Sequence, residues 1–196
     1  MSEVTKFKDC IPVGVSARHL HLSREHLDAL FGKGYELTKK KELSQPGQYA
    51  SEETVDIMTT KGAFTRVRIL GPVRKETQIE ISLTDSLKLG ITPPIRDSGN
   101  LEGSPGVVLV GPNGTITLDK GAIVALRHIH MTPADAAHFG VKDKDIVQVE
   151  CCGERAMTMG QVLIRVNEQY ALEMHVDTDE SNAACLKTGM KLTLIR

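Results

Sequence analysis

The sequence predicts a mainly β protein, built as β-barrels capped by short α-helices. Runs of alternating apolar and polar residues follow one another closely and are separated by Gly, Pro, Asn and Asp, which is typical of strands joined by tight turns. Helical patterns are few and short, so a parallel sheet with crossover helices is not favoured. The sequence contains no glycine-rich phosphate loop and no G-x-S-x-G nucleophile motif.

The first strand is expected at residues 11–16, and two hairpins are expected later in the chain. In the first hairpin, Thr60-Lys61-Gly62 forms the turn, and in the second it is Gly111-Pro112-Asn113-Gly114, where Asn-Gly is a strong turn signal. The remaining strands, including those of the hairpins, are expected at residues 54–58, 64–70, 78–83, 107–110, 115–118, 146–151, 161–166, 171–176 and 191–195.

Three short helices are expected because a side chain that can cap a helix precedes each of them. The caps and spans are Ser23 to about Leu30 with Gly32 as the stop, Thr132 with Pro133 in the first helical position, and Asp177 or Thr178 to about Leu186.

Composition excludes several classes of protein. Of the 196 residues, 40% are hydrophobic and 25% charged, as in ordinary globular proteins. A net charge of −1 and the absence of Trp argue against nucleic-acid binding, and no apolar run reaches the length of about 20 residues that spans a membrane. Four cysteines without a Cys-x-x-Cys pair and a polar N-terminus without a secretory signal favour a cytoplasmic protein with reduced thiols.

An internal repeat gives the first indication of chemistry. The segment from Ser16 to Ser23 (SARHLHLS) recurs from Ala125 to Thr132 (ALRHIHMT). In both copies an Arg, a His, an aliphatic residue and a second His precede a hydroxyl residue that can cap a helix. Two related halves, each with a strand that leads into a capped helix, explain this pattern.

Each His-x-His motif places two imidazoles on one face of a strand, because alternate residues of a strand share a face. His19 and His21 form the first pair, and His128 and His130 form the second. Neutral imidazole is the commonest ligand of transition metals in proteins. A single His-x-His is weak evidence, but the repeat predicts a metal site, with zinc as the expected metal.

Two histidines do not complete a zinc shell, so each pair needs further ligands. Glu80 and His175 are candidates, because each lies on the polar face of an expected strand. The alternative for either residue is a solvated strand face.

Several basic side chains are candidates for binding an anion. Arg74 follows the Gly71-Pro72 turn, and a planar guanidinium beside a metal would suit phosphate or carboxylate. A solvated charged surface is the alternative for this group, whose other members are Arg66, Arg68, Lys75, Lys39, Lys40 and Lys41.

Four segments together resemble the PduL-type phosphate propanoyltransferases, also called phosphotransacylases. The segments are VGVSARHLHLS from Val13, QPGQYA from Gln45, RHIHM from Arg127 and LEMHVDTDE from Leu172. The resemblance runs from about residue 11 to residue 196. Members of this family exchange an acyl group between coenzyme A and inorganic phosphate.

The resemblance implies two β-barrels that are discontinuous in sequence. Residues 8–17 and 126–196 would form the first barrel, and residues 18–125 the second, with a small hairpin insertion near residues 32–52. A site with two zinc ions would lie between the barrels. The periodicity of the sequence does not itself indicate this interleaving.

The resemblance also implies roles for individual residues. One zinc would be held by His19, His21 and Glu80, and the other by His128, His130 and His175. Arg74 matches the arginine that contacts phosphate. The positions that match residues near coenzyme A are Ser16, Lys41, Arg68 and Asn182.

The expected partners are therefore acyl-CoA or CoA and phosphate, with a homo-oligomer (a dimer or larger) as the assembly. Family members packaged in bacterial microcompartments carry an amphipathic N-terminal extension. Only about ten polar residues precede the first expected strand here, which favours a cytoplasmic enzyme over one in a microcompartment lumen.

We hypothesise a direct attack of phosphate on the thioester of propanoyl-CoA or acetyl-CoA, because no Ser or Cys with an evident activating partner is visible. Two alternatives remain open at this stage. A cupin-type oxygenase or isomerase would use Glu25 with the first His pair, although Glu25 falls in an expected helix. A non-catalytic, metal-stabilised barrel that serves assembly is the other alternative.

Overall fold

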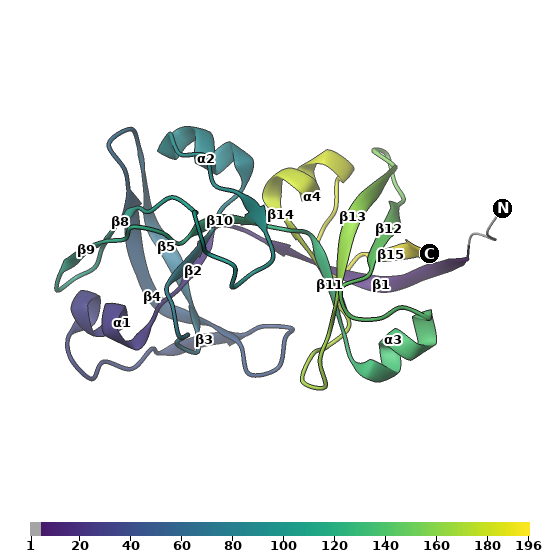
Figure 1. Ribbon diagram of the computed structural model, residues 1–196, viewed down its shortest axis with the longest axis horizontal. Coiled ribbons are helices and arrows are strands. Elements are labelled where there is room, and N and C mark those ends of the chain that lie inside the picture. Colours follow the sequence, from purple (N-terminus) through teal and green to yellow (C-terminus); the bar gives the residue numbers. More distant parts are fainter. Residues whose placement is uncertain (1–4) are drawn as a thin grey trace. The chain divides into compact units, whose positions relative to one another are not determined.

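The structure, a computed structural model, describes residues 5–196, which form fifteen strands and four short helices (Figure 1). The predicted fold class is confirmed: the protein is mainly β, with one closed barrel, one half-barrel and short capping helices.

The chain divides into two compact units. Unit 1 contains the residues up to Ser16, the short segment Ser44–Pro46, and Leu126–Arg196; unit 2 contains Ala17–Leu43 and Gly47–Ala125. Each unit has its own hydrophobic core. Ile129 and Met174 are fully buried in the first core, and Leu20 and Ile79 in the second.

Unit 1 is a closed six-stranded barrel, because β1 pairs with β14 on one side and with β15 on the other. In barrel order, the strands are β1 (Lys6–Ser16), β14 (Glu173–Asp177), β11 (His128–Met131), β13 (Met157–Val166), β12 (Ile146–Cys151) and β15 (Lys191–Ile195). Two helices accompany them, α3 (Pro133–Phe139) after β11 and α4 (Thr178–Ala184) after β14.

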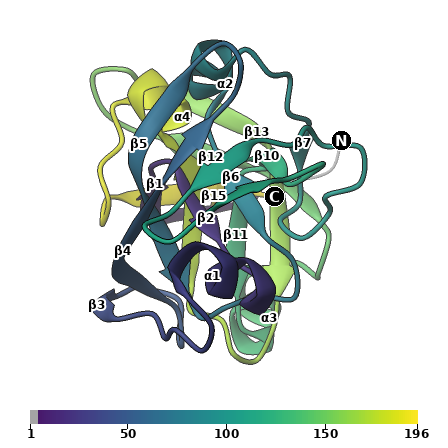
Figure 2. The same cartoon turned by 90° about the vertical axis from the view of Figure 1, so that its left-hand side faces the viewer.

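Unit 2 is a nine-stranded open sheet. Its order is β7 (Ile95–Arg96), β10 (Ala122–Ala125), β6 (Gln78–Glu80), β2 (His19–His21), β5 (Ala63–Gly71), β4 (Tyr49–Met58), β8 (Val108–Val110) and β9 (Thr115–Thr117), with β3 (Lys39–Glu42) beside β4. The helices are α1 (Arg24–Phe31) and α2 (Leu83–Leu89). The β4–β5 turn lies beside α2, where Thr59 Oγ1 donates to the Leu89 carbonyl at 2.6 Å (Figure 2).

The two units share one topology. The order β10-β6-β2-β5-β4-β8 in unit 2 repeats β1-β14-β11-β13-β12-β15 in unit 1, with the same parallel and antiparallel pairings. The units also exchange a strand. β1 precedes the first His motif in the chain but pairs within unit 1, and β10 precedes the second His motif but pairs within unit 2.

One sequence-based assignment is wrong at its end. The strand expected at residues 78–83 stops at Glu80, and helix α2 begins at Leu83. The reason is a capping box: the Ser82 side chain accepts from the backbone N–H of Asp85, and the Asp85 side chain accepts from the backbone N–H of Ser82. The three expected helices are present as α1, α3 and α4, with Ser23, Thr132 and Asp177 as their N-caps.

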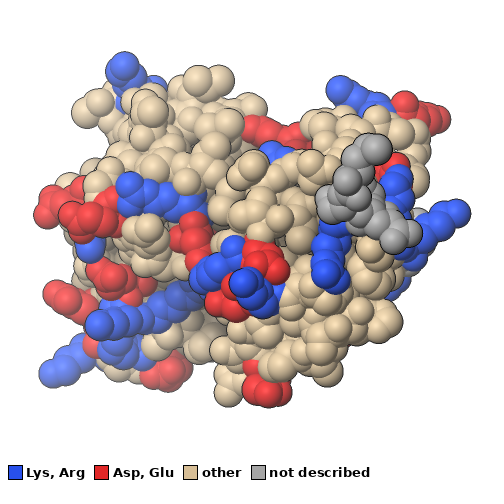
Figure 3. Space-filling view, turned by 45° about the vertical axis from the view of Figure 1, so that its right-hand side comes forward, with Lys and Arg blue, Asp and Glu red and all other residues tan. Residues whose placement is uncertain are grey.

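The protein surface carries both signs of charge. Lys and Arg side chains are interspersed with Asp and Glu over the face that Figure 3 shows, in keeping with the net charge of −1. Within residues 5–196, none of the helices combines the length and the apolar character that crossing a membrane would require.

Candidate metal centre

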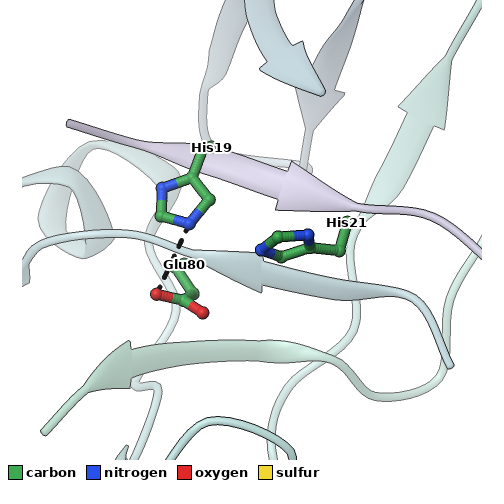
Figure 4. A group of neighbouring side chains, drawn as sticks. All are labelled: His19, His21 and Glu80. Atoms are coloured by element: carbon green, nitrogen blue, oxygen red, sulfur yellow. Dashed lines mark ion pairs between the residues drawn. The ribbon is translucent and has the colours of Figure 1, made fainter. Parts of the chain in front are cut away.

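The first His-x-His motif forms a cluster with Glu80. β2 and β6 pair so that His19 faces Glu80 and His21 faces Gln78. The potential ligand atoms of His19, His21 and Glu80 lie within 4.8 Å of one another, and His19 Nε2 is 3.5 Å from Glu80 Oε2 (Figure 4). Three such donors on two adjacent strands could hold a metal ion.

The imidazoles of this cluster are fixed by their surroundings. His19 Nδ1 lies 2.8 Å from the carbonyl oxygen of Ala17, which leaves Nε2 facing Glu80. Burial lowers the pKa of His21 well below its ordinary value, with a further contribution from the positive charge of Arg74. The His21 ring is therefore neutral, which is the form that binds metals. Between them, Leu20 points into the core and is fully buried.

The second His-x-His motif is built in the same way in unit 1. β11 and β14 pair so that His128 faces His175 and His130 faces Glu173. The ring centroids lie 4.6 Å apart for His128 and His130, 5.2 Å for His128 and His175, and 4.9 Å for His130 and His175. His128 Nδ1 is 2.8 Å from the Leu126 carbonyl, as His19 Nδ1 is from that of Ala17.

Glu173 lies on the same face of β14 as His175. Its Oε2 is 3.0 Å from His175 Nε2, and it also accepts a hydrogen bond from the Ser44 hydroxyl. Burial by itself would raise the pKa of Glu173, but the contacts with His175 and Ser44 hold that pKa below its ordinary value. Glu173 is therefore a buried carboxylate that remains ionised.

The arginine of each motif has a structural role. Arg18 binds Asp85 through two hydrogen bonds of 2.7 and 3.0 Å, and Arg127 donates to Glu180 at 2.6 Å. Asp85 and Glu180 are the equivalent capping-box residues of α2 and α4. Each arginine thus ties the start of a His-x-His strand to the helix that follows Glu80 or His175.

Arg74 lies beside the first cluster. Its backbone N–H donates to the Leu22 carbonyl at 2.8 Å, which fixes it next to the end of β2. Its Nη1 is 3.4 Å from Ser98 Oγ, and its charge acts on the pKa of His21. The structure therefore brings Arg74 together with the first His pair.

The other predicted substrate-binding residues are placed as follows. Arg68 faces His19 across the β2–β5 pair, and its guanidinium donates to the carbonyls of Ser51 and Glu52 at 2.9 and 2.7 Å. Ser16 ends β1, Lys41 lies exposed in β3, and Asn182 lies exposed in α4. Their roles toward coenzyme A remain predictions.

Sequence reasoning missed the residues that support the clusters. Gln78 donates to Glu80 Oε1 at 2.5 Å, and Ser98 donates to the same oxygen at 3.0 Å. Gln78 was visible as a polar residue on the face of Glu80, whereas nothing in the sequence placed Ser98 or Ser44 nearby. Glu25, which a cupin-type site would use, is exposed on α1.

Known proteins resemble this chain over most of its length. The model of the phosphate propanoyltransferase family matches residues 12–187. A phosphate propanoyltransferase of Thermotoga maritima is 64% identical over 180 residues, which cover 91% of this chain and 86% of that protein. One from Lachnoclostridium phytofermentans is 56% identical over 186 residues, with 94% and 87% covered. One from Listeria monocytogenes is 47% identical over 186 residues, with 95% and 87% covered.

The repeated His clusters, the two-unit β architecture and these similarities agree with one another, and the chain belongs to the phosphate propanoyltransferase family of acyltransferases.

Proposed function

We propose that this protein transfers a short acyl group, propanoyl or acetyl, between coenzyme A and inorganic phosphate, in both directions, at a site with two zinc ions. The observation that carries the proposal is the pair of equivalent His clusters, each with a third ligand on the adjacent antiparallel strand. The relatives, which are named phosphate propanoyltransferases, support the acyl and phosphate chemistry.

The donor atoms fit zinc. The first cluster offers two imidazoles and one carboxylate, and the second offers three imidazoles, sets that leave a coordination position open for a substrate. We assign one zinc to His19, His21 and Glu80, and one to His128, His130 and His175. Zinc there would supply a Lewis acid for the thioester carbonyl and a soft partner for the thiolate.

Arg74 is the residue that we propose for binding phosphate. Its positive charge acts on His21, and its Nη1 is 3.4 Å from Ser98 Oγ. The planar guanidinium has the geometry that suits phosphate oxygens. Phosphate is already an anion at neutral pH, so it needs positioning and charge neutralisation more than a strong base. Arg74 would provide both at the first cluster.

The proposed reaction is a direct displacement. A phosphate oxygen attacks the thioester carbon, a carbon–oxygen bond forms, and the carbon–sulfur bond breaks. The products are an acyl phosphate and the thiolate of coenzyme A. We assign coenzyme A contacts to Ser16, Lys41, Arg68 and Asn182.

The setting that we propose is a cytoplasmic homo-oligomer, without a nucleic-acid or membrane partner. The net charge of −1 supports the absence of nucleic acid as a partner, and four cysteines without a Cys-x-x-Cys pair fit a reducing compartment.

The proposed function is tested by the release of coenzyme A thiol from propanoyl-CoA and acetyl-CoA, with and without phosphate, alongside elemental analysis of bound metal. We expect release that requires phosphate and two zinc ions per chain. Release that is equally fast without phosphate would identify a thioester hydrolase instead. Full metal content without release for either substrate would favour the assembly module.

A second measurement addresses the direct attack. Labelled coenzyme A should not exchange into acyl-CoA when phosphate is absent, because no acyl-enzyme forms. Rapid exchange under that condition would contradict direct displacement and indicate a covalent intermediate.

A further inference from the structure

We propose that Gln78 and Glu173 are matched positioning residues, each of which holds the third ligand of its His cluster in place. We further propose that Glu173 supplies to the second cluster the negative charge that Glu80 supplies to the first. This inference rests on the proposed two-zinc function and extends it to residues outside the predicted ligand sets.

Strand register establishes which residues correspond. In unit 2 the first histidine of the motif faces Glu80 and the second faces Gln78; in unit 1 the first faces His175 and the second faces Glu173. Glu80 therefore corresponds to His175, and Gln78 corresponds to Glu173. Because residues two apart share a strand face, each positioning residue lies beside its third ligand.

Gln78 is held at both ends of its amide. Its carbonyl oxygen accepts from the backbone N–H of Gly99 at 2.7 Å, and this contact fixes which way the amide points. Its NH₂ group donates to Glu80 Oε1 at 2.5 Å and approaches Ser98 Oγ at 2.6 Å. Gln78 is almost fully buried, with 1% of its surface exposed. A donor of fixed direction thus faces a carboxylate ligand.

Glu173 is held beside His175 by an ion-pair contact and by Ser44. Its carboxylate lies 3.0 Å from the ring nitrogen Nε2 of His175 and accepts from Ser44. Gly14 of β1 packs against it, and a β-carbon there would lie 2.8 Å from Glu173 Cδ. A carboxylate of fixed position thus lies next to the imidazole of His175.

Two residue differences between the clusters balance in charge. Glu80 is replaced by His175, and Gln78 is replaced by Glu173. The first group of four contains two His, the carboxylate of Glu80 and the amide of Gln78; the second contains two His, the imidazole of His175 and the carboxylate of Glu173. Each group therefore contains one carboxylate, which would lie beside the proposed zinc ion. Exchanging only one residue of a pair would set acceptor against acceptor, or remove the carboxylate altogether.

The first test is Glu173→Gln, which keeps the shape of the side chain and removes its charge. Zinc content is measured by elemental analysis after dialysis against a graded series of chelator concentrations. We expect one of the two zinc ions to be lost at a chelator concentration about 10- to 100-fold lower than in the wild type. The matched control is Glu150→Gln, at an exposed ion pair with Lys6 on the same barrel, and it should retain both ions.

The second test exchanges the whole pair. His175→Glu alone should lose the second zinc, because Glu173 would then face another acceptor. The double variant His175→Glu/Glu173→Gln reproduces the arrangement of Glu80 and Gln78, and should recover zinc affinity to within about tenfold of the wild type. Cobalt(II) in place of zinc adds a spectroscopic readout of ligand geometry that a merely structural role would not move.

The outcomes separate this inference from the function on which it rests. If the wild type binds fewer than two zinc ions, the two-zinc function fails. If the wild type binds two and Glu173→Gln releases both at the wild-type chelator concentration, the positioning role is overturned and the two-zinc function stands. A double variant no better than His175→Glu would overturn the matched exchange.

Discussion

The two His clusters share a backbone arrangement and differ in the side chains that complete it. In both, the His-x-His strand pairs antiparallel with the strand of the third ligand and parallel with a further strand. The residue that faces the first histidine of the motif is Glu80 in one and His175 in the other. The shared backbone arrangement fixes where the clustered side chains lie. The side chains that differ give the two clusters different surroundings.

The surroundings of the second histidine of each motif differ between the clusters. His21 has the positive charge of Arg74 acting on it, whereas the ring of Tyr170 lies 4.2 Å from that of His130. An anion is favoured beside the first cluster, and the aromatic ring gives the second cluster a less polar flank. The two clusters therefore combine one strand arrangement with different neighbours beside the second histidine.

Removing a proposed metal ligand should have the largest effect. Each such variant should lose the zinc ion of one cluster and keep that of the other. His19→Ala and His128→Ala should each cost one zinc per chain and lower kcat/KM by at least about 100-fold, since each deletes a ligand. Zinc content and thiol release measure both effects. His138→Ala, at an exposed helical histidine, is the control. Loss of both ions from a single variant would show that the clusters are not independent.

Arg74 sharpens the difference between the clusters, because its positive charge acts on His21 of the first His pair. Arg74→Ala should raise the KM for phosphate about 10- to 100-fold, with acyl-CoA affinity and zinc content little changed. Steady-state kinetics with varied phosphate provide the measurement. Lys75→Ala removes an adjacent exposed charge and should behave as the wild type. An Arg74→Ala variant with an unchanged KM for phosphate would contradict the assigned role.

The two motif arginines test how far the equivalence extends to stability. Arg18→Ala and Arg127→Ala should each lower the free energy of unfolding, by about 1–2 kcal/mol, because each leaves a capping-box carboxylate without its partner. The Arg18 variant should lose more, since the side chain of Asp85 is 5% exposed and that of Glu180 is 17% exposed. Denaturant unfolding measures the difference. A larger loss for Arg127→Ala would reverse the predicted order.

Gly14→Ala should have the smallest effect and should be confined to the second cluster. The added β-carbon would displace the end of Glu173 without altering its charge. Zinc affinity of the second cluster should fall severalfold, by less than in Glu173→Gln, and chelator titration detects the change. The equivalent residue beside Glu80 is Ile123, so Ile123→Val is the control in unit 2. Equal weakening of both ions would show that Gly14 acts on the whole fold instead.

Much of the local structure could be predicted from the sequence, because its signals are local. The capping residues Ser23, Thr132 and Asp177 mark three of the four helices. Strand alternation also identified Glu80 as a candidate third ligand. α2 was missed because its capping box follows directly after β6, and the apolar alternation runs on past the end of that strand.

Long-range relations could not be predicted from periodicity. The exchange of β1 and β10 depends on pairings between segments that are distant in sequence, and only the resemblance to a family implied such interleaving. The contacts of Ser98 with Glu80 and of Ser44 with Glu173 join a loop to a strand across 18 and 129 positions. Nothing in the residues near Ser44 or Ser98 indicates these partners.

The central claim is that two zinc ions, one at each cluster, support phosphate-dependent acyl transfer. The most direct test is to remove metal with a chelator, add zinc back in steps, and follow thiol release from propanoyl-CoA with phosphate. Activity should vanish in the metal-free protein and return fully only as zinc approaches two ions per chain. Full activity without metal would contradict the claim, as would full recovery at one ion per chain.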